Sequence, residues 1–543
     1  MGSIIKKLGT SEWLIIFICL FHLIANIIWI NLDNAPEAWD QSGNSLISLN
    51  FINYLIGDNS RDFLAISDYY PPLVHLITAF FMILFGASQE IGQIIVSLFF
   101  LASIIFLYLY TLELFKNRTT ALLTAIFYSF LPTIYGLSRN YLLDIPLLTL
   151  VFASLYFLEK SVSFTHKKFT IFFAVSFGLA LLTKWYAPIY LFVPLFLRLI
   201  KAIKNPQRRV INNLLLAILI VVIIAVPWYV RNFETLTRLG LNNIQGELDD
   251  ARNIFEWKTI SYYFFAMTNF QLTWLGMITF LSSIPTVLHS KRKKVIMIFF
   301  SMLFIYIVFT LVGNKNIRYP LMLVPLASIV IGYFLYLTLH HNKILGRILL
   351  LILGIYFIGY FFALSFGILI DPAKFGFRKS IFIPLLGWID LINLDKETSK
   401  YLAPKYQADI WPNEIILKDL SKKKESFRVL VIVEKPNLNP ENLKVIKRLI
   451  NLPNIELDAP YNMGVPFNNQ ESLELYIFKN KYVLVAEKDL GSPTGVKHYP
   501  VMKQIQEYLE QNEGKDNLKM VKRINSYILP DGDYLTVYET QAI

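Results

Sequence analysis

Long apolar runs, separated by short polar or basic connections, fill the sequence from residue 13 to residue 370. A helix that crosses the hydrocarbon core of a membrane needs about 20 apolar residues. The runs that approach or exceed this length lie at 13–30, 71–87, 91–115, 119–137, 141–159, 168–183, 186–200, 210–230, 262–288, 295–313, 319–339 and 344–370. Apolar residues make up 55% and charged residues 17% of the chain, against about 45–50% and about 25% in soluble proteins. The sequence therefore predicts a polytopic α-helical membrane protein, and it excludes a soluble enzyme, a collagen-like chain and a disordered protein.

The first apolar run, at 13–30, is interpreted as an uncleaved membrane span. Lys6 and Lys7 precede it, which would also suit a secretory signal peptide. However, no small-x-small cleavage site follows the run, and the run is long for a signal sequence. The basic flank predicts a cytoplasmic N-terminus, so residues 31–70 would lie outside.

Basic residues alternate between successive connections and predict the side of each one. Connections rich in Lys and Arg lie at 116–118, 167–168, 201–209, 291–294 and 343–347. By the positive-inside rule these are cytoplasmic, and those at 139–144, 184–185, 234–256 and 313–319 are outside. The net charge of +12 could also indicate a nucleic-acid partner. Because the charges cluster in short connections between apolar runs, we assign them to the membrane and expect no nucleic acid.

With the connections assigned to these sides, one apolar run cannot cross the membrane. Residue 70 is predicted outside and residue 116 inside, yet two runs, 71–87 and 91–115, separate them. The shorter run, 71–87, opens with two prolines and suits an interfacial or re-entrant helix. We therefore predict about eleven spans, juxtamembrane structure in the first outer connection and an outside C-terminus. The chain would be an integral protein of the plasma or inner membrane.

The composition changes after Asp371, where the long apolar runs end and Lys, Glu, Asn and Pro increase. We predict two domains, a membrane module at 1–371 and an extracytoplasmic α/β domain at 372–543, the latter of ordinary domain size. The patterns predict a buried strand at 427–433, helices at 443–449 and 501–510, a strand pair within 473–486, and a hairpin joining 527–529 to 534–538 across Pro530-Asp531-Gly532-Asp533.

The long first outer connection carries the first candidate residues. Asp40 stands between Trp39 and Gln41, and Tyr69 and Tyr70 end the connection just before its two prolines. A polar connection of this length between two spans is often functional. A solvated acidic loop that only helps to orient the chain would have the same composition.

Ionisable residues at the outer ends of spans form a second group of candidates. Asp144 begins an apolar run, so it should face a cavity or a cation such as Arg139, or cap the N-terminus of a helix. Lys184, Lys315 and Arg318 are cations on the predicted outer side, against the charge rule. They suggest binding of an anion such as a lipid phosphate, or snorkelling of long side chains to the interface.

The sequence contains no recognisable metal motif. His75 is the histidine nearest the predicted outer surface, and Cys19 is the only cysteine, so no intramolecular disulfide can form. Neither HExxH nor a P-loop occurs, which argues against a zincin and an ATP-driven pump. No cofactor is required by the sequence, and the use of a divalent cation stays open.

Several short motifs, taken in order, resemble the GT-C glycosyltransferases of membranes, specifically the protein O-mannosyltransferase and aminoarabinose-transferase branch. They are Trp39-Asp40-Gln41, Tyr70-Pro71-Pro72-Leu73, Ser138-Arg139 with Leu143-Asp144-Ile145-Pro146, Leu182-Thr183-Lys184, Pro227-Trp228 and Arg318-Tyr319-Pro320, and they cover residues 1 to about 370. Three departures stand out: the family's Asp-Glu pair is Asp40-Gln41, the Glu-Lys pair of the aminoarabinose branch is Tyr69-Tyr70, and the oligosaccharyltransferase signature WWDYG is absent.

The resemblance implies transfer of a sugar from a polyprenyl-phosphate donor lipid to a hydroxyl group of a protein, lipid or glycan acceptor on the outer side, with inversion. It also suggests a role for each candidate. Asp40 would be the general base and Asp144 a second catalytic residue, Lys184, Arg318, Arg139 and Lys315 would bind the donor phosphate, and Trp39, Gln41, Tyr69, Tyr70 and His75 would contact acceptor or sugar. Two other classes stay open, a transporter or flippase for a lipid-linked or anionic substrate and a non-catalytic membrane scaffold.

Overall fold

The computed structural model describes residues 9–57, 62–204, 206–245, 253, 255–371, 378–383, 387–393, 405–422, 425–460, 465–491, 498–514 and 519–542. The chain divides into two compact units. Unit 1 comprises residues 1–30, 53–80 and 90–406, and unit 2 comprises residues 31–52, 81–89 and 407–543. The basic flank Lys6-Lys7 and residues 246–252 of the predicted outer connection at 234–256 lie outside the described residues.

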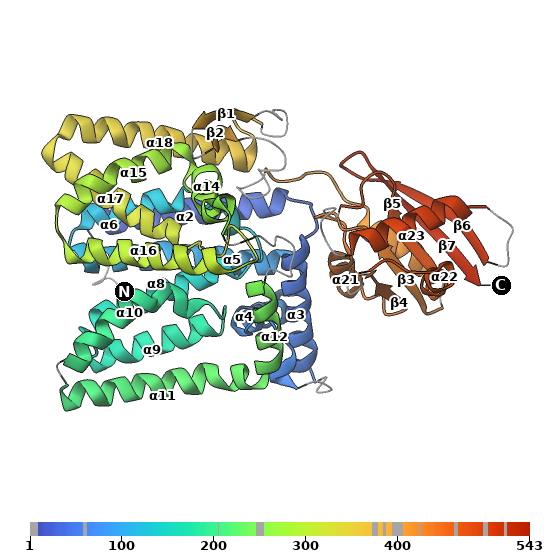
Figure 1. Cartoon of the computed structure of the whole chain (residues 1–543), viewed down its shortest axis with the longest axis horizontal. Helices are drawn as coiled ribbons and strands as arrows, with labels where there is room; N and C mark the ends of the chain where they lie inside the picture. Colours follow the sequence, from blue (N-terminus) through green and yellow to red (C-terminus); the bar gives the residue numbers. More distant parts are fainter. Residues whose placement is uncertain are drawn as a thin grey trace. The chain divides into compact units, whose positions relative to one another are not determined.

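Unit 1 consists mainly of helices (Figure 1). They are α2 (Thr10–Leu32), η1 (Phe63–Ala65), α4 (Leu73–Phe85), α5 (Gln89–Phe115), α6 (Arg118–Ser129), α7 (Pro132–Leu137), α8 (Asp144–Lys160), α9 (Lys167–Leu181), α10 (Ala187–Lys204), α11 (Arg208–Arg231), α12 (Phe233–Gln245), α13 (Trp257–Ile260), α14 (Tyr262–Ala266), the π-helix η2 (Met267–Gln271), α15 (Thr273–His289), α16 (Lys293–Leu311), α17 (Leu323–His341) and α18 (Lys343–Phe366). A hairpin of β1 (Arg378–Ile383) and β2 (Gly387–Asn393) follows α18.

Within the described residues, six helices are long and apolar enough to cross a membrane: α2, α5, α11, α16, α17 and α18. The bent pair formed by residues 262–271 and α15 gives a seventh if it is taken as one span. The structure thus bears out a polytopic helical membrane protein. The expected number of about eleven spans stays a prediction, because the runs at 119–137, 141–159, 168–183 and 186–200 form shorter or more charged helices.

The apolar run at 71–87 forms α4, a helix of 13 residues. At a rise of 1.5 Å per residue this helix is about 20 Å long, whereas the hydrocarbon core is about 30 Å thick. Its length therefore agrees with the prediction of a helix that does not cross.

Close packing of small residues joins the helices of unit 1. Helix α17 packs against α6, α15, α16 and α18, while α9 packs against α8 and α11. At Gly332 in α17, an added Cβ would lie 2.8 Å from the backbone nitrogen of Thr124 in α6. Glycine is thus required where these two helices touch, as is common for helices packed in membranes.

Unit 2 contains a five-stranded sheet in the order β4-β3-β5-β7-β6. Its elements are α3 (Trp39–Leu55, shared with unit 1 at its end), α20 (Asn413–Ser421), β3 (Phe427–Ile432), α21 (Pro440–Leu449), β4 (Ile455–Asp458), α22 (Gln470–Phe478), β5 (Tyr482–Ala486), α23 (Tyr499–Asn512), β6 (Lys519–Ile528) and β7 (Tyr534–Ala542). Strands β4, β3 and β5 are parallel, and β7 and β6 continue the sheet antiparallel. The β6–β7 pairing runs from Lys519↔Ala542 to Ile528↔Tyr534, with a register shift between Arg523 and Asn525.

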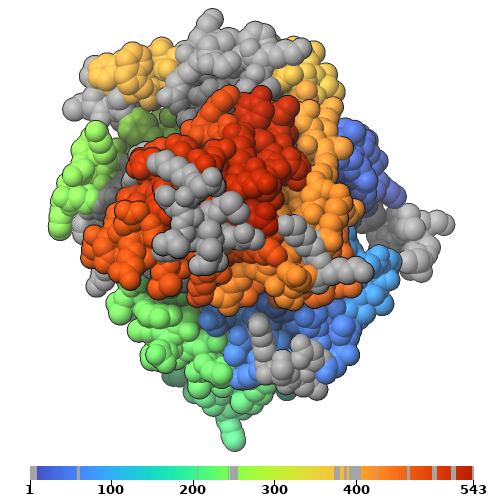
Figure 2. All heavy atoms as spheres, turned by 90° about the vertical axis from the view of Figure 1, so that its right-hand side faces the viewer, coloured from blue at the N-terminus to red at the C-terminus, as the bar shows by residue number. Residues whose placement is uncertain are grey.

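The sheet is buried on both faces because alternate residues of its central strands enter different cores. Val429 and Val431 of β3 pack in one core with α20 and α21, whereas Leu430 and Ile432 pack in the other with α22 and α23. This burial explains the uninterrupted apolar sequence of β3. Figure 2 shows the C-terminal residues, orange to red, from the side that faces right in Figure 1.

One predicted element of unit 2 is wrong. Residues 473–478, which alternate like a strand, form the last six of the nine residues of α22, and only 482–486 form a strand. Leu473 and Ile477 are buried four residues apart, while Leu475 is 75% exposed. The side chain of Asn469 accepts a hydrogen bond from the Ser472 amide and caps this helix, a start signal that outweighed the alternation.

Candidate functional site

Asp144 is the first residue of α8 and is almost fully buried, with 2% exposure. The residue in the N-cap position is Leu143, and no side chain caps this helix end. The alternative that Asp144 acts as an N-cap is therefore wrong. Its carboxylate still lies at the positive end of the helix dipole, which favours a negative charge there.

Two cations from distant parts of the chain meet Asp144. Lys184, in the turn between α9 and α10, donates a hydrogen bond from Nζ to Oδ1 of Asp144 over 2.8 Å. Arg318, between α16 and α17, places a guanidinium nitrogen 3.6 Å from Oδ2. The hydroxyl of Tyr186 donates to Oδ1 over 3.2 Å, and the ammonium of Lys184 lies 5.0 Å from the centre of the Tyr186 ring.

One buried carboxylate contacts two cations. Asp144 pairs with Lys184 through Oδ1 and with Arg318 through Oδ2. Lys184 is the more buried of the two cations, while the side chain of Arg318 is 23% exposed. The carboxylate of Asp144 thus holds Lys184 and Arg318 at one place, and Lys and Arg side chains are common ligands of phosphate groups.

The sequence suggested Arg139 as a partner of Asp144, but in the structure the two side chains do not pair. Its Nε donates to Oδ1 of Asn26 in α2 over 3.0 Å, and its guanidinium lies within 5.3–5.8 Å of four aromatic ring centres. These rings belong to Trp29, Tyr135, Phe361 and Phe366. Cation–π contacts and one side-chain amide thus stabilise this buried cation. Its closeness to Asp144 in the sequence had suggested a carboxylate partner instead.

Lys315 lies just beyond α16, where helical carbonyl groups lack intrahelical partners. Its ammonium donates hydrogen bonds to the carbonyl oxygens of Phe309, Thr310 and Val312. Lys315 is 3% exposed. These contacts give Lys315 a clear structural role at the end of α16.

The first outer connection is divided between the two units. Asp40 lies in the first turn of α3 in unit 2 and is exposed. Trp39, the residue before it, is 38% exposed and has a positive φ of 23°, which is strained for a bulky side chain. Gln41 is half-buried one residue further on.

The other residues expected to contact substrate lie in unit 1. The rings of Tyr69 and Tyr70 meet edge to face at 4.5 Å, and Ser67 donates a hydrogen bond to the carbonyl of Tyr70. His75 in α4 is fully buried, with its ring 6.3 Å from that of Tyr141. Nearby, the side chain of Arg231 bonds Asp62 and lowers the pKa of that carboxyl.

One residue of the site was not predicted from the sequence. Tyr186 shares the carboxylate of Asp144, and its position beside Lys184 and Trp185 was the only signal for it. Within the described part of the chain, no group of three or more His, Cys, Asp and Glu side chains is arranged to hold a metal ion. At Asp144 itself, the two neighbouring cations make a further cation unfavourable.

Residues 70–230 match the family model described as dolichyl-phosphate-mannose-protein mannosyltransferase. This range contains Arg139, Asp144, Lys184 and Tyr186, whereas Asp40 and Arg318 lie outside it. No curated protein sequence matches the chain significantly.

Solved structures of membrane glycosyltransferases share this fold. The structure of ArnT from Cupriavidus metallidurans bound to undecaprenyl phosphate is 12% identical, with a TM-score of 0.57, over 97% of this chain and 98% of that one. The arabinofuranosyltransferase AftD from Mycobacteria is 11% identical, with a TM-score of 0.58, over 99% of this chain and 40% of that one. The oligosaccharyltransferase AglB from Archaeoglobus fulgidus, in complex with an inhibitory peptide and a dolichol-phosphate, is 13% identical, with a TM-score of 0.50, over 95% and 74%.

Proposed function

Because the chain has the GT-C fold, and residues 70–230 match the mannosyltransferase family, we propose that it is an integral-membrane glycosyltransferase. Its donor would be a polyprenyl-phosphate-linked sugar, and its acceptor a hydroxyl group on the outer side. The observation that carries this proposal is the cluster in which Asp144 holds Lys184 and Arg318 together. A lipid phosphate is the anion that such a cluster would meet at the membrane interface.

In the proposed reaction, the acceptor oxygen forms a bond to the anomeric carbon of the sugar while the bond from that carbon to the phosphate oxygen breaks. Asp40 takes the hydroxyl proton, since an alcohol is a weak nucleophile without a base. The electron pair of the broken bond stays on the carrier phosphate, where Lys184 and Arg318 stabilise the charge. A single displacement of this kind inverts the anomeric configuration.

The roles of the remaining candidates follow from their contacts. Asp144 orients Lys184 and Arg318 and is a positioning residue in this scheme. Arg139 and Lys315 have structural partners, so we rank them behind Lys184 and Arg318 as phosphate ligands. Trp39, Gln41, Tyr69, Tyr70 and His75 remain candidates for sugar or acceptor contacts.

The test is consumption of a radiolabelled polyprenyl-phosphate sugar by the purified full-length protein in membranes, with release of the carrier phosphate. Asp40→Asn should lower the rate by about 10²- to 10⁴-fold while donor binding persists. Asp68→Asn, which removes an exposed carboxylate from the same outer connection, is the matched control and should retain activity. Near-normal turnover of Asp40→Asn would reject Asp40 as the base.

A second arm tests the phosphate site. Lys184→Ala should weaken donor binding, since it removes the cation nearest Asp144. An unchanged donor affinity would remove Lys184 from the phosphate site. Movement of an intact donor across the membrane without sugar transfer would favour a flippase. The absence of both transfer and movement would favour a non-catalytic scaffold.

A further inference from the structure

The segment that carries Asp40 belongs to the same compact unit as the C-terminal domain. Residues 31–52 and 407–543 are parts of unit 2, although more than 350 residues separate them in sequence. Between α2 and α3 the chain runs through residues 33–38 without regular structure. The position of Asp40 therefore depends on what holds this short stretch and the helix that follows.

Backbone and side-chain hydrogen bonds join the two parts on the N-terminal side of Asp40. The Asn34 amide donates to the carbonyl of Gln407 over 2.7 Å, and the Gln407 amide donates to the carboxylate of Asp33 over 2.7 Å. The side chain of Asn34 also donates to the carbonyl of Ala408 over 2.8 Å. These reciprocal bonds fix the direction in which the chain leaves α2.

Two side chains of the domain bond the segment on either side of Asp40. Nδ2 of Asn437 donates to the carbonyl of Pro36 over 2.8 Å, four residues before Asp40. A guanidinium nitrogen of Arg448, near the end of α21, donates to the side chain of Asn50 in α3 over 2.6 Å. We call Asp33, Asn34, Gln407, Asn437 and Arg448 the bracket.

The loop that presents Asn437 is itself fixed by buried amides. Asn413 of α20 donates to the Asn437 carbonyl over 2.9 Å. Asn439 donates to the carbonyls of Lys435 and Pro436, and it forms a reciprocal capping box with Asn442 at the start of α21. Satisfied buried networks of this kind favour one geometry over others.

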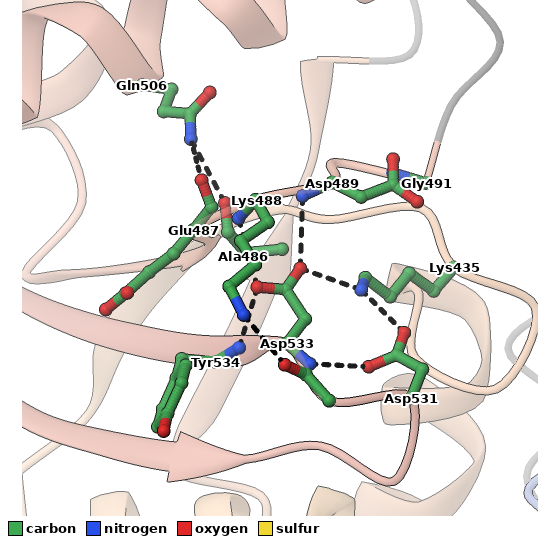
Figure 3. A network of polar contacts seen from close by, with 11 residues as sticks. Lys435, Ala486, Glu487, Lys488, Asp489, Gly491, Gln506, Asp531, Asp533 and Tyr534 are labelled. Carbon is green, nitrogen blue, oxygen red and sulfur yellow. Dashed lines mark hydrogen bonds and ion pairs between the residues drawn. The ribbon is translucent and has the colours of Figure 1, made fainter.

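A buried ion-pair network anchors the same loop to the turn between β6 and β7 (Figure 3). The ammonium of Lys435, 3% exposed, bonds Asp531 over 2.6 Å and Asp533 over 2.8 Å. Asp533 also accepts the backbone amides of Lys488, Asp489 and Tyr534. Burial opposes the charge of Lys435, but these bonds and the two acidic charges outweigh it and raise the pKa of the ammonium.

At the other end of the connection, Glu37 joins the held stretch to α3. Its carbonyl accepts the Ser42 hydroxyl over 2.6 Å, and its carboxylate accepts the Ser45 hydroxyl over 2.5 Å. Asp40 lies between these contacts, next to the strained Trp39. Hydrogen bonds and short stretches of backbone thus connect the sheet with the turn that carries Asp40.

We propose that the C-terminal domain positions Asp40 for proton transfer through the bracket, a role that rests on the proposed function of Asp40 as the base. Asp40 lies in the first turn of α3, between Pro36 and Asn50, which the domain bonds through Asn437 and Arg448. A general base must lie within about 2.6–3.2 Å of the proton that it removes, and a displacement of about 1 Å can cost about 10²-fold in rate. Asn437 and Arg448 are therefore positioning residues.

Hydrogen exchange of the full-length protein in lipid nanodiscs tests the physical link without needing activity. In Asn437→Ala and in Arg448→Ala, amides of Asn34 and of the first turns of α3 should exchange about fivefold faster or more, the effect of losing about one hydrogen bond. Strands β3 and β5 should keep their protection. Lys444→Ala, in the same helix and paired only locally with Glu441 in the described contacts, is the matched control. Unchanged exchange in both bracket variants would overturn the proposal.

Kinetics with the radiolabelled polyprenyl-phosphate sugar separate positioning from simple stability. Both bracket variants should lower kcat with donor affinity unchanged, and Arg448→Lys, which keeps a donor, should recover much of the loss. Faster exchange with unchanged kcat would overturn the positioning role. If Asn437→Ala also removes the exchange protection of β3 and β5, it has unfolded the domain, and the test then depends on Arg448→Ala, which changes an exposed side chain. An inactive wild-type protein would instead refute the proposed function, while the exchange results would still report the link.

Discussion

At the scale of single residues, the Asp144–Lys184 pair is the more deeply buried of the two ion pairs in the proposed donor site. Its two side chains are 2% and 9% exposed. Removing one partner of a buried ion pair costs up to about 3–5 kcal/mol when the other charge is left uncompensated, and the cost is smaller here because Arg318 still faces Asp144. We therefore expect Lys184→Met to lower the Tm of the full-length protein in detergent markedly.

Lys116→Met is the matched control, because it breaks an ion pair with Glu113 in which the lysine side chain is 68% exposed. Exposed pairs contribute only about 0–1 kcal/mol, so its Tm should stay close to wild type. The double variant Asp144→Asn with Lys184→Met should recover part of the loss. Equal Tm values for Lys184→Met and Lys116→Met would contradict the interpretation that Lys184 belongs to a buried ion pair.

The bracket contains one residue that titrates near neutral pH. Burial raises the pKa of Asp33 to about 6, despite hydrogen bonds from the amides of Gln407 and Ala35 that favour its charged form. When the segment is undocked, this carboxyl should return to its ordinary value of 3.8. Between these values the docked form binds more protons, so docking weakens as the pH rises through this window.

We therefore expect the amide of Asn34 to lose protection between pH about 4 and about 7, by roughly tenfold or more after correction for intrinsic exchange. In Asp33→Asn, which stays neutral and keeps an acceptor for the Gln407 amide, this dependence should disappear. Hydrogen exchange at a series of pH values is the measurement. An identical pH dependence in the variant would assign the effect to another group.

At the scale of elements, the contact between α6 and α17 depends on the absence of a side chain at Gly332. A Cβ there would lie 2.3 Å from Oγ1 and 2.8 Å from the backbone nitrogen of Thr124. Backbone atoms cannot move aside as a flexible side chain can, so Gly332→Ala should force the helices apart. Overpacking of this kind costs about 1–3 kcal/mol.

Gly354 in α18 offers a control for that substitution, since a Cβ added there would meet no atom within 4 Å. Gly354→Ala should be neutral or slightly stabilising, because alanine favours helix over glycine by up to about 1 kcal/mol. Thermal unfolding of both variants in detergent compares them. A smaller Tm loss for Gly332→Ala than for Gly354→Ala would contradict the close packing.

Local signals in the sequence were enough for several elements. Apolar runs predicted the long apolar helices of unit 1, because length and hydropathy mark such helices, whereas α12 and η1 lie in stretches predicted as connections. The apolar stretch at Phe427 and the turn at Pro530-Asp531-Gly532-Asp533 predicted β3 and the β6–β7 hairpin. At 473–478 two local signals competed, and the cap at Asn469 decided for a helix.

At the scale of the whole molecule, the contacts that build the candidate site could not be predicted from the sequence, because they join residues far apart along the chain. The proposed partner of Asp144 was Arg139, five residues away, whereas its partners in the structure are Lys184 and Arg318. Arg139 turns to Asn26 and four rings, which only the packing of α2, α7 and α18 could bring together. Likewise, no sequence pattern connects Pro36 with Asn437.

The orientation of the chain decides whether the proposed site faces the outside, and the native cysteine content makes it measurable. Cys19 is buried and is the only cysteine, so the wild-type protein should give little background with a thiol reagent that does not cross membranes. Lys293 lies in a predicted cytoplasmic connection and Glu471 in the C-terminal domain, and both are exposed. In intact cells, Glu471→Cys should react with the reagent from outside, whereas Lys293→Cys should react only after permeabilisation. The reverse pattern would place Lys291–Lys294 outside, against the positive-inside rule, and would move acceptor and transfer to the cytoplasmic side.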